Sequence, residues 1–117
     1  MGGRRVPGGL EYSLNVGGIR SERQLFSYFA AELAFPDYFG HNWDALDECM
    51  RDLSWVRDDV CAGDHKGGGH VRIAIAGCDR LKEKQPRLWS RLSGAIELWM
   101  DHWENIEPEA RVEIMLV

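Results

Sequence analysis

The chain has 117 residues, of which 44% are hydrophobic and five are tryptophan, and this composition suits one folded domain rather than a disordered chain. Its formal net charge is −5, and its 14 Lys and Arg residues are scattered along the sequence. Because phosphate binding needs a basic patch, we expect a basic protein partner and no direct binding to nucleic acid.

The N-terminal segment, residues 1–9, is expected to be a flexible lead-in to a single domain over residues 10–117. Arg4 and Arg5 are not followed by an apolar run, so the segment does not fit a secretory signal. No stretch approaches the roughly 18 apolar residues of a membrane span, so no membrane association is expected. Three cysteines, an odd number, favour reduced thiols. These features predict a cytoplasmic protein.

The first part of the domain predicts a strand and then a helix. Hydrophobic residues alternate over residues 10–16, which is typical of a strand, and a Gly-Gly pair then predicts a turn. Ser21 and Gln24 match a capping box that opens a helix. Its core-facing residues are Leu25, Phe26, Phe29 and Leu33. Pro36 ends this helix.

A second helix is predicted over residues 43–53, where apolar residues recur at spacings of three and four. Asn42 precedes it and has a side chain suited to an N-cap. Three acids at four-residue spacing occupy the outer face, and Asp47 flanks them; the three are Asp44, Glu48 and Asp52. Like charges so placed repel one another. Although such a face is often only solvated, this one indicates a surface for a cationic partner.

The rest of the chain predicts a loop, a strand, a helix and a strand. Residues 56–69 are polar and glycine-rich, which is typical of a loop. The apolar run over residues 71–76 predicts a parallel strand that is covered on both faces. A long helix is predicted to begin at Pro86, and a final strand over residues 112–117. The order βααβαβ implies an α/β fold with a three-stranded parallel sheet.

The region of the acidic helix resembles the barstar family, the intracellular protein inhibitors of small secreted microbial ribonucleases. The matching residues are Tyr38, Phe39, Gly40, Asn42, Asp44, Ala45, Leu46, Glu48 and Cys49. Their fixed spacing makes the resemblance, which is sharp over residues 33–55, far more specific than a two-residue motif. It implies a barstar-like fold and an inhibitor of antitoxin or immunity type, without enzymatic activity, cofactor or metal.

The resemblance also implies which acids bind a small basic ribonuclease, either barnase-like or guanyl-specific. Asp44 and Glu48 would be the charge anchors that occupy its cationic active site, because arginine–carboxylate pairs strengthen once water is excluded. One acid on the long helix, Asp101 or Glu104, would add to them. The alternative for Asp44 is that it only complements the helix macrodipole.

The loop before the helix would supply the neighbouring contacts. The resemblance makes Tyr38 and Phe39 aromatic contacts and gives Gly40 and Asn42 the shaping of the loop. The alternative is that both aromatic residues are buried, since aromatic side chains after a proline turn are more often core residues than exposed ones.

Two positions depart from the family pattern. His41 stands where barstar proteins carry an acid, and Asp47 stands where they carry a tryptophan. An anion contact thus becomes a titratable imidazole, and an aromatic contact becomes a further acid. Both residues are still expected at the partner-binding surface.

Three other interpretations fit parts of this sequence: an enzyme, a zinc site and a module that binds another basic protein. His41, Asp44, Glu48 and Cys49 are close enough in sequence for acid–base or thiol chemistry, but a helix turns Cys49 away from Asp44. The Cys and His residues over positions 61–78 match no common zinc spacing, so no metal is predicted. A barstar-like module could equally bind a basic protein that is not a ribonuclease, because the same acidic surface would serve both.

Overall fold

A computed structural model describes residues 3–6, 9–56 and 70–117. The predicted loop over residues 56–69, with Cys61 and His65, therefore lies outside the described residues except for its first position. The described chain forms a four-stranded sheet in the order β1-β2-β3-β4. Its strands are β1 (Gly3–Val6), β2 (Gly9–Asn15), β3 (His70–Ala76) and β4 (Val112–Leu116). Because β2, β3 and β4 run parallel, the predicted three-stranded parallel sheet is confirmed.

The edge strand β1 lies in the segment for which the sequence predicts only a lead-in. It pairs antiparallel with β2, and Arg4 lies opposite Glu11. Nη2 of Arg4 donates to Oε1 of Glu11 at 2.9 Å. A strand at a sheet edge is held mainly by backbone hydrogen bonds to its neighbour and does not need alternating hydrophobic residues. The sequence of β1 therefore carries no pattern that predicts a strand.

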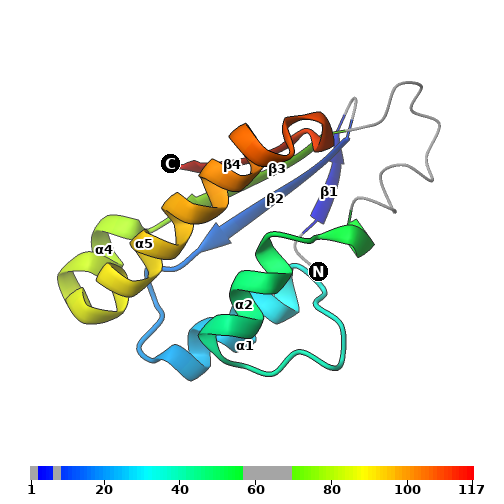
Figure 1. Ribbon diagram of the computed structural model, residues 1–117. Helices are drawn as coiled ribbons and strands as arrows, with labels where there is room; N and C mark the ends of the chain where they lie inside the picture. Colours follow the sequence, from blue (N-terminus) through cyan, green and yellow to red (C-terminus); the bar gives the residue numbers. More distant parts are fainter. Residues whose placement is uncertain (1–2, 7–8, 57–69) are drawn as a thin grey trace.

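The helices follow in the order α1 (Glu22–Glu32), α2 (Trp43–Met50), α4 (Cys78–Lys84) and α5 (Pro86–Asp101), as Figure 1 shows. A π-helical turn, η1 (His102–Ile106), extends α5, and a 3₁₀ turn, η2 (Pro108–Ala110), precedes β4. The predicted N-cap of α1 is confirmed, since Oγ of Ser21 accepts from the backbone N–H of Gln24 at 3.1 Å. The sequence prediction missed α4, because only Leu81 of its seven residues is buried and no apolar stripe marks it.

One face of the sheet packs on the helices and the other meets solvent. Along β3, buried residues alternate with partly exposed ones, so the prediction of a strand covered on both faces is wrong. The open face carries an ion-pair network: Nε of Arg72 donates to Oε1 of Glu113 at 3.0 Å, and Nη1 lies 3.8 Å from Oε2 of Glu11. Ala74 and Ala76 occupy two further outward positions of β3, and for this reason residues 71–76 look almost continuously apolar in the sequence.

Two tryptophans hold α2 against α5 and η1. Trp99 is fully buried, and its Nε1 donates to Oδ1 of Asp47 at 2.9 Å. Nε1 of Trp103 donates to the carbonyl of Met50, also at 2.9 Å. These two bonds lie at the middle and at the end of α2, so they fix both its position and its rotation about its own axis.

Candidate functional site

The loop from residue 34 to residue 41 is a compact turn built on an aromatic base. Ala34 adopts a left-handed conformation, with φ of 53°, and the N–H of Phe35 then returns to the carbonyl of Ala30 at 2.9 Å. The N–H of Phe39 closes a second turn on the carbonyl of Pro36 at 3.0 Å. The Phe35 and Phe39 rings meet edge to face, with centroids 4.9 Å apart.

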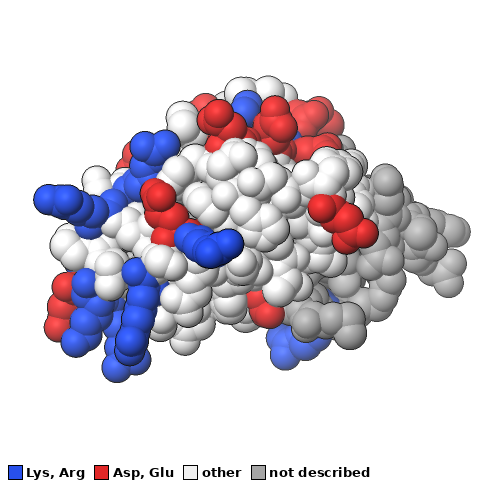
Figure 2. All heavy atoms as spheres, turned by 90° about the horizontal axis from the view of Figure 1, so that it is seen from below, with Lys and Arg blue, Asp and Glu red and all other residues white. Residues whose placement is uncertain are grey.

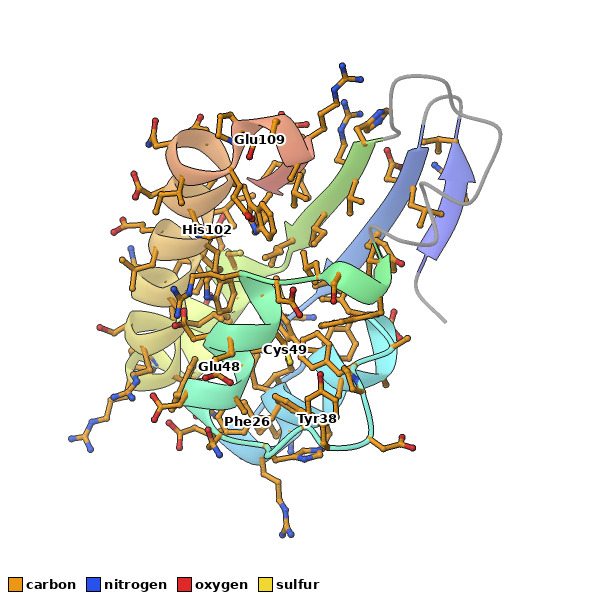
Figure 3. The ribbon with its side chains drawn as sticks, turned by 45° about the vertical axis from the view of Figure 1, so that its right-hand side comes forward. Phe26, Tyr38, Glu48, Cys49, His102 and Glu109 are labelled. Carbon is orange, nitrogen blue, oxygen red and sulfur yellow. The ribbon has the colours of Figure 1, made fainter. Side chains whose placement is uncertain are left out.

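The two predicted aromatic contacts therefore have different positions. Phe39 is only 6% exposed and forms part of the base of the loop, which is the buried position that the alternative gave it. Tyr38 is 81% exposed. Figure 3 shows Tyr38 on the loop before α2 and Glu48 on the helix itself. The turn that Phe39 closes on Pro36 explains the difference, because Phe39 packs inward on Phe35 while Tyr38 lies within the exposed turn.

His41 and Asn42 set the start of α2. Asn42 is the N-cap as predicted: its Oδ1 accepts from the N–H of Ala45 at 2.8 Å, and its Nδ2 donates to the carbonyl of Gly40 at 3.2 Å. His41 is exposed and has φ of 49°. Its Nδ1 lies 3.1 Å from the carbonyl oxygen of Phe39, and because a carbonyl only accepts, Nδ1 donates there.

The outer face of α2 carries free carboxylates. Asp44 and Glu48 are exposed, while Leu46 and Met50 on the opposite side are buried. Asp52 is also exposed, but it follows the end of α2, and its Oδ2 accepts from Oγ of Ser54 at 3.1 Å. Within the residues that the structure describes, neither Asp44 nor Glu48 forms an ion pair or a side-chain hydrogen bond. Figure 2 shows acidic side chains gathered along one edge of the molecule, away from its basic end. Two unpaired carboxylates one helical turn apart are available to a cationic partner.

Asp47 differs from the other acids of α2, because both of its oxygens are occupied. Oδ1 accepts from Nε1 of Trp99 at 2.9 Å, and Oδ2 accepts from Nη2 of Arg51 at 2.6 Å. Asp47 thus holds α2 to α5, a role that the sequence did not predict, and its contact with a partner stays a prediction. The sequence could not show this role, because Trp99 is 52 residues away.

Asp47→Ala should lower the free energy of unfolding by about 1–3 kcal/mol, because it leaves the indole N–H of Trp99 without its partner. Urea unfolding measures this change. Glu48→Ala is the matched control, as it removes the neighbouring acid from the exposed face and should shift stability by no more than about 0.5 kcal/mol. Equal stabilities for the two variants would contradict the structural role of Asp47.

The structure distinguishes the two candidate acids at the end of α5. Asp101 lines a surface hollow next to α2, and Asp47 and Arg51 line the same hollow. Glu104 instead lines a hollow against β4. The position beside α2 therefore favours Asp101 as the member of the acidic surface.

Two exposed apolar side chains beside Asp101 were missed by the sequence analysis. Leu98 is 64% exposed and Ile106 is 63% exposed, and both line the hollow next to α2. The sequence could have indicated Leu98, because other residues already fill the core-facing positions of α5 and Leu98 falls on its polar face. Ile106 likewise stands among polar residues just after α5. They extend the acidic surface with contact area that a partner could bury.

The position of Cys49 prevents its thiol from reacting together with the carboxylates of α2. It is buried on the core side of α2, whereas Glu48 is exposed on the other side (Figure 3). Asp44 is exposed as well. Burial raises the pKa of the Cys49 thiol, and the carboxylates of Asp52 and Glu48 raise it further, so the thiol stays protonated at neutral pH. In the described part of the chain, no three His, Cys, Asp or Glu residues group closely enough to hold a metal ion.

The comparison with known families agrees with this geometry. Among residues 3–6, 9–56 and 70–117, no helix has the length and apolar character needed to cross a bilayer. No curated protein matches the chain. The family model described as barstar, the barnase inhibitor, matches residues 11–115, which is nearly the whole sequence. The chain therefore belongs to the barstar family.

Proposed function

We propose that this protein is an intracellular inhibitor that plugs the cationic active site of a small secreted microbial ribonuclease with the acidic face of α2. The observation that carries the proposal is the pair of unpaired, exposed carboxylates, Asp44 and Glu48, on a helix of a barstar-family chain. A ribonuclease concentrates Arg, Lys and His side chains to hold phosphates. Carboxylates fixed on a helix can occupy those phosphate positions and form charge-assisted hydrogen bonds.

Neighbouring residues extend the proposed contact surface. Tyr38 adds a large aromatic side chain on one side, and Asp101 with its apolar neighbours adds area on the other. Gly40 and Asn42 fix the loop that presents Tyr38. The acidic field should speed association with a basic partner, an effect that falls as salt is added.

Titrating the protein into a guanyl-specific microbial ribonuclease, with RNA cleavage as the readout, tests the proposal. We expect inhibition that is complete at one inhibitor per enzyme, and no cleavage of RNA by this chain alone. The second candidate is binding to a basic protein that is not a ribonuclease, which the same acidic surface supports. Failure to bind any of several basic ribonucleases would favour that candidate.

Binding should also weaken as the pH is lowered, because a protonated His41 would face a cationic partner with a positive charge. Nδ1 of His41 already donates to the loop, so the added proton goes to Nε2 and places a positive charge beside a cationic partner. Dissociation constants from pH 5 to 8, for wild type and His41→Gln, measure the effect. The ribonuclease titrates identically in both series, so parallel profiles would show that His41 never meets the partner.

A further inference from the structure

Basic side chains that are scattered in the sequence gather at one end of the folded molecule. Figure 2 shows Lys and Arg concentrated at the end where α4 and the start of α5 lie in Figure 1. The segment before α1 contributes Arg20, and α4 contributes Arg80 and Lys84. Sixty residues separate the first two in the sequence, which hid the cluster from the sequence analysis.

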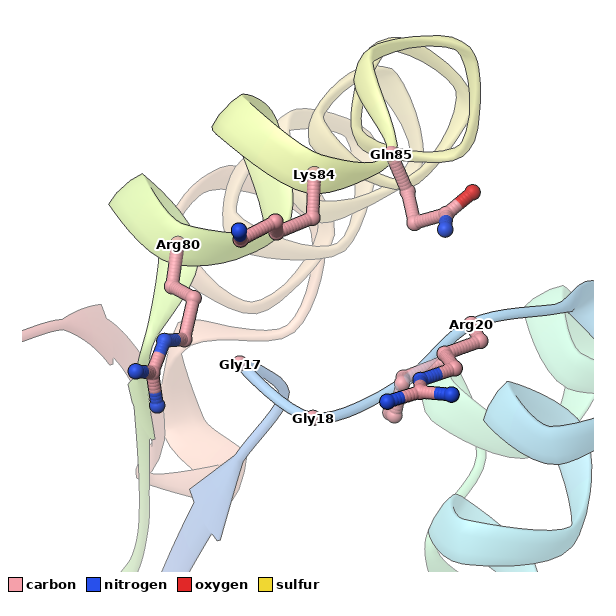
Figure 4. A pocket seen from close by; sticks show the side chains of 7 residues that line it. Gly17, Gly18, Arg20, Arg80, Lys84 and Gln85 are labelled. Atoms are coloured by element: carbon pink, nitrogen blue, oxygen red, sulfur yellow. The ribbon is translucent and has the colours of Figure 1, made fainter.

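These three cations line one cavity of about 580 Å³. It lies where β2 and β3 end, and its other lining residues are Gly17, Gly18, Ile19 and Gln85. Figure 4 shows Arg80 and Lys84 on one side of the glycine turn and Arg20 on the other. No acidic residue is among the described residues that line it. The carboxyl ends of parallel strands are a common place for ligands in α/β proteins.

The cations of this cavity lack the ion pairs that three other arginines form. Arg4, Arg51 and Arg72 each form an ion pair with a nearby acid. Within the described residues, neither Arg20, Arg80 nor Lys84 makes any ion pair. Three like charges around one space repel one another, and a bound anion would relieve that repulsion.

The base of the cavity is rigidly built. The N–H of Gly17 donates to Oδ1 of Asn15 at 2.9 Å, and the N–H of Ile19 closes the turn on Val16 at 3.2 Å. Gly77, with φ of 80°, packs so closely that an added Cβ would lie 2.4 Å from Oδ1 of Asn15. A Cβ on Gly17 would lie 3.2 Å from Cδ of Arg80, so the stem of Arg80 rests on the turn.

We infer that this cavity binds a phosphorylated small molecule, with the phosphate held between Arg20, Arg80 and Lys84. Guanidinium groups match phosphate oxygens in pairs, and a lysine ammonium adds a third cationic donor. The N–H of Gly18 forms no hydrogen bond within the described residues, and it is a further donor at the cavity wall. The volume of about 580 Å³ leaves room for an organic group beside the phosphate. Gln85 is placed to hydrogen-bond the remainder.

Calorimetric titration with inorganic phosphate, ribose 5-phosphate and AMP at low salt tests this inference. We expect the two organic phosphates to bind more tightly than inorganic phosphate. Arg80→Gln or Lys84→Gln should weaken binding at least about tenfold, as hydrogen bonds to charged groups contribute that much. Both side chains are exposed, so both variants should unfold at the wild-type urea concentration.

Lys82→Gln is the matched control, because Lys82 is exposed on the same helix but does not line the cavity. It should change the affinity by no more than about twofold, since only a distant, screened charge is lost. Equal weakening by Lys82→Gln would reduce the effect to net charge and overturn the site. Absence of binding by every probe at millimolar concentration would also overturn the site. Equal affinity for all three probes would overturn the inference that the ligand carries an organic group.

Discussion

Asp44→Ala and Glu48→Ala should each weaken binding to a basic ribonuclease by at least about 2 kcal/mol, which is about 30-fold in the dissociation constant. A loss of about 2 kcal/mol on truncation to alanine is the usual threshold for a residue that dominates an interface. The barnase–barstar complex is one of the interfaces for which such losses are known, so this expectation is not independent of the family. Both carboxylates are exposed and unpaired in the described part of the chain, so a cationic partner can take them without breaking an internal bond. Kinetic measurement of association and dissociation would separate lost steering from lost contacts.

Glu83→Ala provides the matched control for these two variants. Glu83 is exposed on α4, near the basic end, and its loss changes the net charge by the same amount. Its affinity should stay within about threefold of wild type, because a distant surface charge is screened by salt. All three variants should keep wild-type unfolding free energies. If Asp44→Ala or Glu48→Ala bound normally, α2 would not be the inhibitory surface.

Trp99→Ala should lower the free energy of unfolding by about 3–5 kcal/mol. Trp99 is 0% exposed and is the largest fully buried side chain, so its removal leaves a cavity that the surrounding core cannot fill. The substitution also removes the indole that Asp47 accepts from. Because native domains are stable by only about 5–15 kcal/mol, the variant should unfold at a much lower urea concentration.

Trp89→Ala on the same helix is the comparison. Trp89 is only partly buried, so the same chemical change should cost clearly less than at position 99. Urea unfolding followed by circular dichroism measures both, because the helical signal does not depend on the tryptophan that is removed. Equal losses for the two variants would mean that α5 does not pack in the orientation described.

The features that the sequence predicted correctly depend on residues close together in the chain. The N-cap at Asn42 needs only the backbone N–H of Ala45, three residues on. The core-facing residues of α1 likewise follow from helical periodicity alone. The family motif lies within one short segment, so it could be recognised before any tertiary contact was known.

The features that the sequence did not predict depend on distant partners. In the sequence Asp47 cannot be distinguished from the other acids of α2, and only the fold places Trp99 beside it. Phe39 is a motif residue that packs on Phe35, which in turn packs on Trp55 in a later segment of the chain. The basic cavity needs α4 to fold next to the turn that precedes α1. In each case the local sequence fits two positions, and only the tertiary fold selects one of them.

The two indole bonds that hold α2 have a consequence for the entropy of association. A helix fixed at its middle by Trp99 and at its end by Trp103 presents its carboxylates in one orientation before any partner arrives. Little backbone freedom is then lost when a complex forms, so more of the contact energy remains as affinity. Tyr38, by contrast, projects from a loop and is 81% exposed, so ordering its side chain offsets part of what its contact contributes.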